Sequence, residues 1–453
     1  MYKLNENPSR ETVLKFLSKS ASFGNLGLFV GAGFSKAVLN DDGSEIALSW
    51  GDLLTKSSEN LGVDYKNIWK EGVSFPDVAT KICELHSAQK GISYEESLRE
   101  LKREICCLTS WYPDKVKRDK YSKSLTAIDA SWIITTNYDL IIESLLTGKS
   151  ITLGPKDQLI KPTNLVPVYH LHGVRTNPES IIIAQEDYVA LFRPSEYRQI
   201  KLALTIKEST VLIIGYGLGD VNVLTALDWS RNVFKEEQSN YPHDVIQVLR
   251  KDNPKESPYR DKNGILILEA DELSKFFEEL STVRSVEVER EKKELDTLNE
   301  LAKELNDPKQ SMIDKFIDEE VFRKKVLIIL SKFPTHLISG FVSFLNKCID
   351  ETWSRSAPNG AFEGYNQNLI IILDILTTFK FNSIPPALFE TAAYGLERVG
   401  YYINEKGQKE GGKSWSATTT WNKRKAELSL EIVSELSNYA KQHWSNRLQI
   451  LLN

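Results

Sequence analysis

Short apolar runs alternate with amphipathic helical segments through the first two thirds of this chain, and this alternation limits the possible folds more than any other feature. Most of the runs are rich in isoleucine and valine, as buried parallel strands are. Strands are predicted at 26–30, 132–135, 166–171, 181–184, 211–214, 245–249 and 265–268. Helices are predicted between them at 138–146, 196–208 and 221–234. The pattern indicates an α/β fold with a doubly wound, Rossmann-like parallel sheet.

Two further stretches complete the expected organisation. Residues 50–128 show helical periodicity and little strand signal, which predicts a helical insertion between the first two strands. Residues 286–307 are highly charged, as a solvated helix face or a linker would be, and we place the domain boundary there. The predicted domains are therefore 1–285 and 286–453. Helices are expected in the second at 312–333, 335–349, 368–379 and 423–452, with loops near 354–366 and 405–420.

Composition narrows the class of protein. The 453 residues carry a net charge of −5, which argues against a broad nucleic-acid or membrane surface. The chain has four cysteines, and none forms a C-x-x-C pair that would indicate a zinc ribbon. No apolar run is long enough for a membrane helix and no signal peptide is evident at the start. We expect a cytoplasmic protein.

The first candidate site follows the first predicted strand and has the sequence Gly31-Ala32-Gly33-Phe34-Ser35. Glycines there would let the backbone approach a diphosphate, and the amides and dipole at a helix start would favour its negative charge. A plain tight turn explains the same residues, so the motif alone leaves both readings open.

Two more clusters end the second and third predicted strands. Thr136, Asn137 and Asp139 follow the second strand, where they could contact a ligand or cap the next helix. His170 and His172 follow the third, and strand alternation would put both on one side. An imidazole there could act as a general base, or the two could bind a metal, although no third ligand is evident nearby.

Two glycine-rich segments remain. Gly215, Gly217 and Asp220 end a later strand and could approach a ribose or adenine, or simply form a turn with a helix cap. Residues 407–414 satisfy the P-loop spacing G-x-x-x-x-G-K-S. A P-loop needs a strand before it and a helix after it, and we expect at best a short strand and a poor helix start. We therefore interpret 407–414 as a charged loop.

Taken in order, GAGFS, TTNYD, HLHG and GYGLGD resemble the sirtuin-like NAD-binding family over roughly residues 20–280. The segment Trp50-Gly51-Asp52-Leu53-Leu54 also looks like its bacterial branch. The resemblance implies that Gly31, Ala32, Gly33, Phe34 and Ser35 form the pyrophosphate-binding turn. It implies that Asn137 and Asp139 lie near the nicotinamide ribose and carboxamide, with Thr136 beside them. It makes His172 the catalytic histidine and places Gly215, Gly217 and Asp220 on the adenosine side.

The departures from the family shape the functional hypothesis. Deacylating sirtuins carry a four-cysteine zinc module after the histidine, whereas residues 173–215 here contain no cysteine, so no zinc is expected. The zinc-less form looks like the sirtuin-like NAD hydrolases of bacterial antiphage defence. The resemblance therefore implies an NAD glycohydrolase, with NAD as substrate, that depletes NAD on infection. The alternatives are a non-catalytic scaffold that senses NAD or ADP-ribose, and an NAD-dependent protein deacylase.

The resemblance also implies partners. It suggests a homo-oligomer, and a partner for the helical C-terminal domain: a HerA-type ATPase, a phage trigger protein or a short Argonaute, the last disfavoured by the mainly helical pattern. Because no catalytic constellation is visible in that domain, we expect an interaction or regulatory module.

Overall fold

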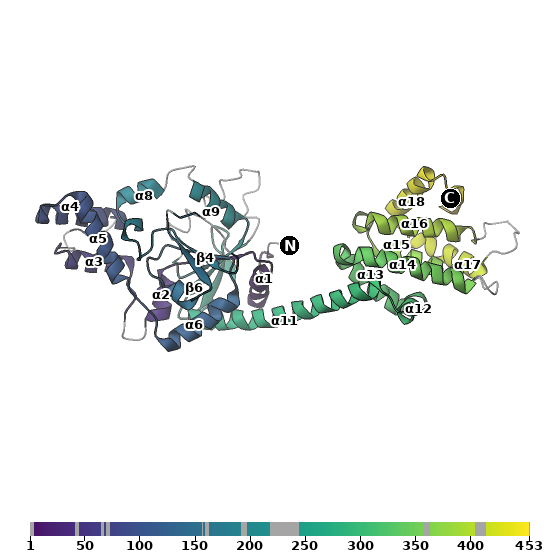
Figure 1. The fold of residues 1–453 in the computed structure, drawn as a ribbon, viewed down its shortest axis with the longest axis horizontal. Helices are drawn as coiled ribbons and strands as arrows, with labels where there is room; N and C mark the ends of the chain where they lie inside the picture. The colour runs from purple at the N-terminus through teal and green to yellow at the C-terminus, as the bar shows by residue number, and fades with distance from the viewer. Residues whose placement is uncertain are drawn as a thin grey trace. The chain divides into compact units, whose positions relative to one another are not determined.

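The computed structural model describes residues 4–40, 45–64, 68, 73–155, 157–158, 163–191, 197–217, 244–356, 363–403 and 414–452. The chain divides into two compact units, Met1–Arg290 and Glu291–Asn453, and many of their helices are labelled in Figure 1. No helix of the described residues is both long and apolar enough to span a bilayer.

One mostly parallel sheet organises the N-terminal unit. Within the described residues it has eight strands in the order β3-β4-β2-β1-β5-β6-β8-β7, and only the β7–β8 pair is antiparallel. The strands are β1 Leu26–Val30, β2 Trp132–Thr135, β3 Ser150–Leu153, β4 Val166–His170, β5 Thr210–Ile214, β6 Val245–Arg250, β7 Tyr259–Arg260 and β8 Leu266–Ala270. The chain builds outward from β1 through β2 and then crosses to β5 on the other side. The predicted doubly wound fold is confirmed, and its switch point lies at β1 and β5.

Both faces of the sheet are buried, because alternate residues of each strand enter different apolar cores. Leu28 and Val30 of β1 pack on one face with α1, α2, α6, α7 and the start of α11, whereas Phe29 packs on the other with α9. The bounds of these helices are α1 Arg10–Ser22, α2 Ala32–Leu39, α6 Lys115–Ile128, α7 Ile141–Leu145, α9 Tyr197–Lys207 and α11 Leu273–Asn306. Burial on both faces explains why the strands are apolar throughout.

Helices fill the predicted insertion. Three of them, α3 Trp50–Asn60, α4 Phe75–Lys90 and α5 Tyr94–Leu108, share an apolar core of their own and contact one another (Figure 1). The fourth, α6, instead packs Tyr121 and Leu125 into the core of the sheet. The insertion is therefore a small helical layer attached to the sheet through its last helix.

The predicted strand at 181–184 is wrong. The segment lies between a 3₁₀ helix, η2 Pro178–Ser180, and α8 Gln185–Leu191. Ile181 and Ile183 bury their side chains in the core of the insertion, so the apolar run reflects burial and not strand pairing. The N–H of Ile182 donates to His172 O at 2.7 Å, and the carbonyl oxygen of Ile182 accepts from the Tyr138 hydroxyl at 2.8 Å.

Other predicted elements change in length or lie elsewhere. The helix expected at 138–146 covers only Ile141–Leu145, because the backbone first turns through the polar residues after β2. The short strands β3 and β7 have no clear signal in the sequence. The helix predicted at 221–234 lies outside the described residues.

The C-terminal unit is helical, as predicted. Its helices after α11 are α12 Gln310–Asp318, α13 Glu320–Lys332, α14 Pro334–Ser356, α15 Glu363–Thr378, α16 Pro386–Gly400, α17 Trp415–Arg424, α18 Leu430–Gln442 and α19 Asn446–Leu452, with 3₁₀ turns η3 Phe381–Ser383 and η4 Lys425–Glu427. The charged stretch is helical as far as Asn306, since α11 runs unbroken through residues 273–306.

The surroundings of the P-loop-like segment differ from those of a nucleotide-binding P-loop. The element before it is the helix α16 rather than a strand. After it, α17 begins at Trp415, which corrects the expected poor helix start, because the Ser414 side chain caps the helix by accepting from Ala417 N at 3.2 Å. Residues 404–413 lie outside the described residues. A P-loop follows a strand, whereas the described element that precedes this segment is a helix.

Candidate functional site

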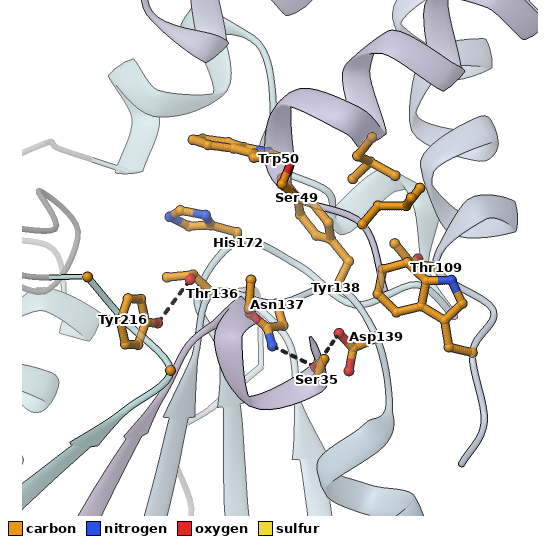
Figure 2. Close-up of a pocket in the computed structure, with 16 residues that line it drawn as sticks. Ser35, Ser49, Trp50, Thr109, Thr136, Asn137, Tyr138, Asp139, His172 and Tyr216 are labelled. Atoms are coloured by element: carbon orange, nitrogen blue, oxygen red, sulfur yellow. Dashed lines mark hydrogen bonds between the residues drawn. The ribbon is translucent and has the colours of Figure 1, made fainter. Parts of the chain in front are cut away.

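A hollow opens at the carboxyl ends of the central strands, where open α/β sheets bind ligands (Figure 2). It encloses about 780 Å³ of space, open solvent included. It is lined by Ala32, Ser35, Leu48, Ser49, Trp50, Leu53, Thr109, Trp111, Thr136, Asn137, Tyr138, Asp139, His172, Gly215, Tyr216 and Gly217. We call it the switch-point cavity.

Three polar side chains form a connected chain at its floor (Figure 2). The Asn137 amide donates to Ser35 Oγ at 3.0 Å, and the Ser35 hydroxyl donates to Asp139 Oδ2 at 2.9 Å. Ser35 comes from the first turns of α2, and the other two follow β2. Burial raises the pKa of Asp139, opposed by the hydrogen bonds from Ile141 N and Ser35. The two strand-end motifs therefore meet as a single network.

The turn that carries Asn137 is fixed from below by Thr135. This threonine is fully buried, donates its hydroxyl to Val30 O at 2.7 Å, and accepts from Asn137 N at 3.0 Å. One side chain therefore joins the ends of β1 and β2. These two hydrogen bonds therefore fix the backbone of Asn137 relative to the ends of β1 and β2.

His172 faces the cavity beneath an aromatic wall. Its ring stacks on Trp50, with centroids 6.2 Å apart and planes at 27° (Figure 2). Tyr188 packs edge-on against the same ring, with centroids 5.3 Å apart. The Tyr188 hydroxyl lies 3.4 Å from Nδ1. Burial lowers the pKa of His172 to about 4. A ring that is neutral at physiological pH can accept a proton, which a general base must do.

His170 does not join His172, contrary to the expectation that both lie on one side. β4 ends at His170, so strand alternation does not extend to His172. His170 is buried away from the switch-point cavity, with Nε2 2.7 Å from Glu143 Oε1 and Nδ1 2.9 Å from Asn137 O. The two histidines therefore occupy different environments.

The glycines of the first turn are required by a second turn. A Cβ on Gly31 or Gly33 would lie 2.7 or 2.8 Å from Gly215 O. The amides of Gly31 and Gly33 donate to Ile214 O and Gly215 O, both at 2.9 Å. The close approach that demands glycine is therefore between the turns after β1 and β5, in addition to any approach by a ligand.

We predict that Gly215→Ala destabilises the N-terminal unit by about 1–3 kcal/mol, because Gly215 has φ +76° and a Cβ would lie 2.4 Å from Phe34 N. The matched control is Gly264→Ala, with φ +80° and nothing within 4 Å of the added carbon. Urea unfolding of both variants separates the cost of the backbone angle from that of the clash. Equal losses in the two would contradict the interlocked turns.

The remaining predicted residues are placed as follows. Ala32 and Gly217 line the cavity, and Thr136 Oγ1 lies 2.9 Å from the Tyr216 hydroxyl at its wall. Phe34 does not line it, because its ring packs against Tyr121 and Phe277 in the core. Any ligand contact by Phe34 is therefore limited to its backbone. Asp220 lies outside the described residues.

The sequence alone did not single out several wall residues as site residues. Trp50 begins α3 of the insertion, Tyr188 lies on α8, and Tyr216 follows the glycine after β5. Trp50 lies in the Trp50–Leu54 segment and Tyr216 in the GYGLGD motif, but neither motif indicates that these rings line the site. Aromatic residues far apart in sequence gave no periodic pattern that would bring them to His172.

A second, wider hollow shares Gly215, Tyr216 and Gly217 with the first. It encloses about 2140 Å³, open solvent included, and reaches the carboxyl ends of β6 and β8. Its charged lining consists of Lys36, Lys117, Lys120, Arg250 and Lys251, with Glu45 and Glu272. Lys36 pairs with Glu45 at 3.2 Å. Cations therefore outnumber acids in this hollow, which favours anionic groups such as phosphates.

No group of three or more His, Cys, Asp or Glu side chains in the described part of the chain is arranged to hold a metal ion.

Comparison with known proteins agrees with the fold and the motifs. Residues 131–268 match the family model of the SIR2-like domain. The chain is 25% identical over 267 residues to Defense-associated sirtuin 2 of Bacillus subtilis, an alignment that covers 57% of this chain and 24% of that protein. The chain thus spans less than a third of the length of this relative. Residues 131–268 are therefore similar to a SIR2-like domain, which agrees with the resemblance seen in the motifs.

Proposed function

We propose that this protein is an NAD glycohydrolase, which cleaves the bond between nicotinamide and ribose. The observation that carries the proposal is that Asn137, Asp139 and a neutral His172 meet in one hollow at the switch point of the sheet. Dinucleotides bind at this place in related architectures, and SIR2-like domains use NAD.

To cleave this bond, the protein chiefly has to position the ribose and stabilise the positive charge that develops on it. The nicotinamide of NAD leaves as a neutral molecule from a cationic ring, so the enzyme chiefly stabilises an oxocarbenium-like state. As the C1′–N bond breaks, water forms a new bond to C1′ and gives its proton to His172. Asn137 orients the ribose hydroxyls or the water, and Asp139 holds the carboxamide.

The rest of the dinucleotide fits the other features of the site. The turn at 31–35, with Thr136, holds the diphosphate region, and the motif resemblance assigns Gly215, Gly217 and Asp220 to the adenosine side. The cation-rich hollow next to Gly215–Gly217 supports this placement of the dinucleotide, because its lysine and arginine side chains would attract the phosphates.

The test compares wild type with Asn137→Ala, using the purified full chain and NAD. We expect nicotinamide release to fall roughly tenfold to a hundredfold, because the Asn137 amide would no longer orient the reacting groups. Asn438→Ala, an exposed asparagine in the C-terminal unit, is the control. If the purified protein is silent, the same variants are compared by cellular NAD content after phage infection. Equal NAD loss in wild type and Asn137→Ala would refute the proposal.

The relative found above carries defence in its name, and we propose an antiphage role for this chain as well, acting in the cytoplasm by NAD depletion. We further propose that the protein forms a homo-oligomer and that its C-terminal unit meets a HerA-type ATPase or a phage protein. Size measurement of the protein alone, and after co-expression with each candidate, tests these assemblies.

A further inference from the structure

The second histidine of the HLHG motif is buried in a place that the proposed reaction does not use. His170 is 1% exposed, and both of its ring nitrogens have a close partner. Nε2 lies 2.7 Å from Glu143 Oε1, and Nδ1 lies 2.9 Å from the backbone oxygen of Asn137. Glu143 belongs to α7, so this ring joins the end of β4 to the helix that follows the Asn137 turn.

Both partners present oxygen atoms to the ring, and this favours the doubly protonated state if Glu143 is ionised. A carboxylate and a carbonyl oxygen each need a donor, but a neutral imidazole has only one N–H. Two donated hydrogen bonds therefore require an imidazolium. Burial alone would lower the pKa of His170, but Glu143, the Asn137 carbonyl and the Asp139 charge together raise it above its ordinary value.

Glu143 depends on this ring in turn. Its Oε1 also accepts from the Thr152 hydroxyl at 3.0 Å, whereas its buried Oε2 has no hydrogen-bond partner among the described residues. A buried carboxylate with one unsatisfied oxygen is costly unless a cation lies close to it. A protonated His170 would supply that cation, because its Nε2 lies 2.7 Å from Glu143 Oε1.

We propose that His170 and Glu143 form a buried ion pair that positions Asn137 for catalysis. The inference rests on the proposed function, since it concerns the aim of the Asn137 side chain. The Asn137 backbone is held at both polar atoms, by Thr135 Oγ1 on its N–H and by His170 on its oxygen. With the backbone fixed, the amide points at Ser35 and the switch-point cavity. His170 and Glu143 are positioning residues and touch no substrate.

The first test is spectroscopic and needs no activity. In the full chain labelled with ¹⁵N-histidine, one buried ring should keep both nitrogens protonated at pH 8, and its signal should be absent in His170→Gln. In Glu143→Gln that ring should become neutral at the same pH. The His172 signal, identified by His172→Gln, should be that of a neutral ring. A neutral His170 in the wild type would overturn the ion pair.

The second test separates positioning from folding. We expect kcat for NAD cleavage to fall roughly tenfold to a hundredfold in His170→Gln and Glu143→Gln, with KM changed less than about threefold. Thr152→Val, which removes one hydrogen bond to Glu143, should give a smaller loss in the same direction and covers the case in which the other variants fold poorly.

The matched control is His86→Gln. His86 is also a buried histidine beside a carboxylate, 3.5 Å from Glu100, but it lies in the insertion and not beside Asn137. Its kcat should stay within about twofold of wild type. Wild-type kcat in folded His170→Gln and Glu143→Gln would overturn the positioning role alone, whereas a wild type that never cleaves NAD would overturn the proposed function itself.

Discussion

Substitution of His172 by alanine should lower nicotinamide release from NAD by roughly 10²–10⁴-fold, the usual worth of a general base. His172 is the only imidazole among the described residues that line the cavity, and an imidazole is the usual general base near neutral pH. The measurement is nicotinamide release by the purified variant, with His336→Ala, an exposed histidine of the C-terminal unit, as control. A His172→Ala enzyme of normal activity would contradict the assignment.

The same residue should set an unusual pH profile. Burial lowers the pKa of His172 to about 4, so the ring stays unprotonated and competent as a base down to that pH. The acid limb of kcat/KM should therefore lie near pH 4 and not near the ordinary histidine value of about 6.5. Since the unfolded chain takes up this proton first, His172 makes the fold less stable as pH falls from about 6.5 to 4. Circular dichroism over that range separates unfolding from protonation of the base.

Replacement of Arg323 by methionine should destabilise the C-terminal unit by about 3–5 kcal/mol. Arg323 is 3% exposed and donates from Nε to Asp374 Oδ2 at 2.7 Å. It also donates to the carbonyls of Phe316 and Ile317, at 2.8 and 2.9 Å, where α12 ends. Its loss leaves these carbonyls without that donor and Asp374 with Arg424 as its remaining cation, 2.9 Å away.

Hydrogen exchange of peptides from α15 in the full chain measures this loss, because α15 carries Asp374 and belongs to the core of the unit. Lys324→Met is the control, since Lys324 lies next in sequence but is half-exposed and pairs only with Glu320 at the surface. Such a surface pair contributes about 0–1 kcal/mol. Similar exchange in both variants would show that the buried pair is not a main support of the unit.

The parts of the fold that the sequence predicted are those in which burial and periodicity agree. β1, β2 and β5 are apolar on both faces and end in glycine or polar residues, so their positions are clear. Residues 181–184 have the same composition but pack into the insertion, because an apolar run records burial and not hydrogen-bond pairing. Residues 415–420, rich in serine and threonine, predict a poor helix start, but the Ser414 cap begins α17 there.

The candidate site divides in the same way. Residues at strand ends could be predicted, because parallel strands bring their carboxyl ends to one edge. Trp50 and Tyr188 could not, because their places at His172 depend on how the insertion and α8 pack. The separation of His170 from His172 was also hidden, since it depends on where β4 ends.

The interlocked turns after β1 and β5 have a consequence for how such sequences are compared. A side chain at residue 31 or 33 would clash with the backbone of Gly215. The turns after β1 and β5 should therefore change together among related chains, even in chains that no longer bind the ligand. The presence of these glycines in a related sequence therefore indicates that the two turns pack together, and does not by itself indicate ligand binding. Evidence for activity must come from residues such as Asn137 and His172, whose side chains are not required by the close packing of the two turns.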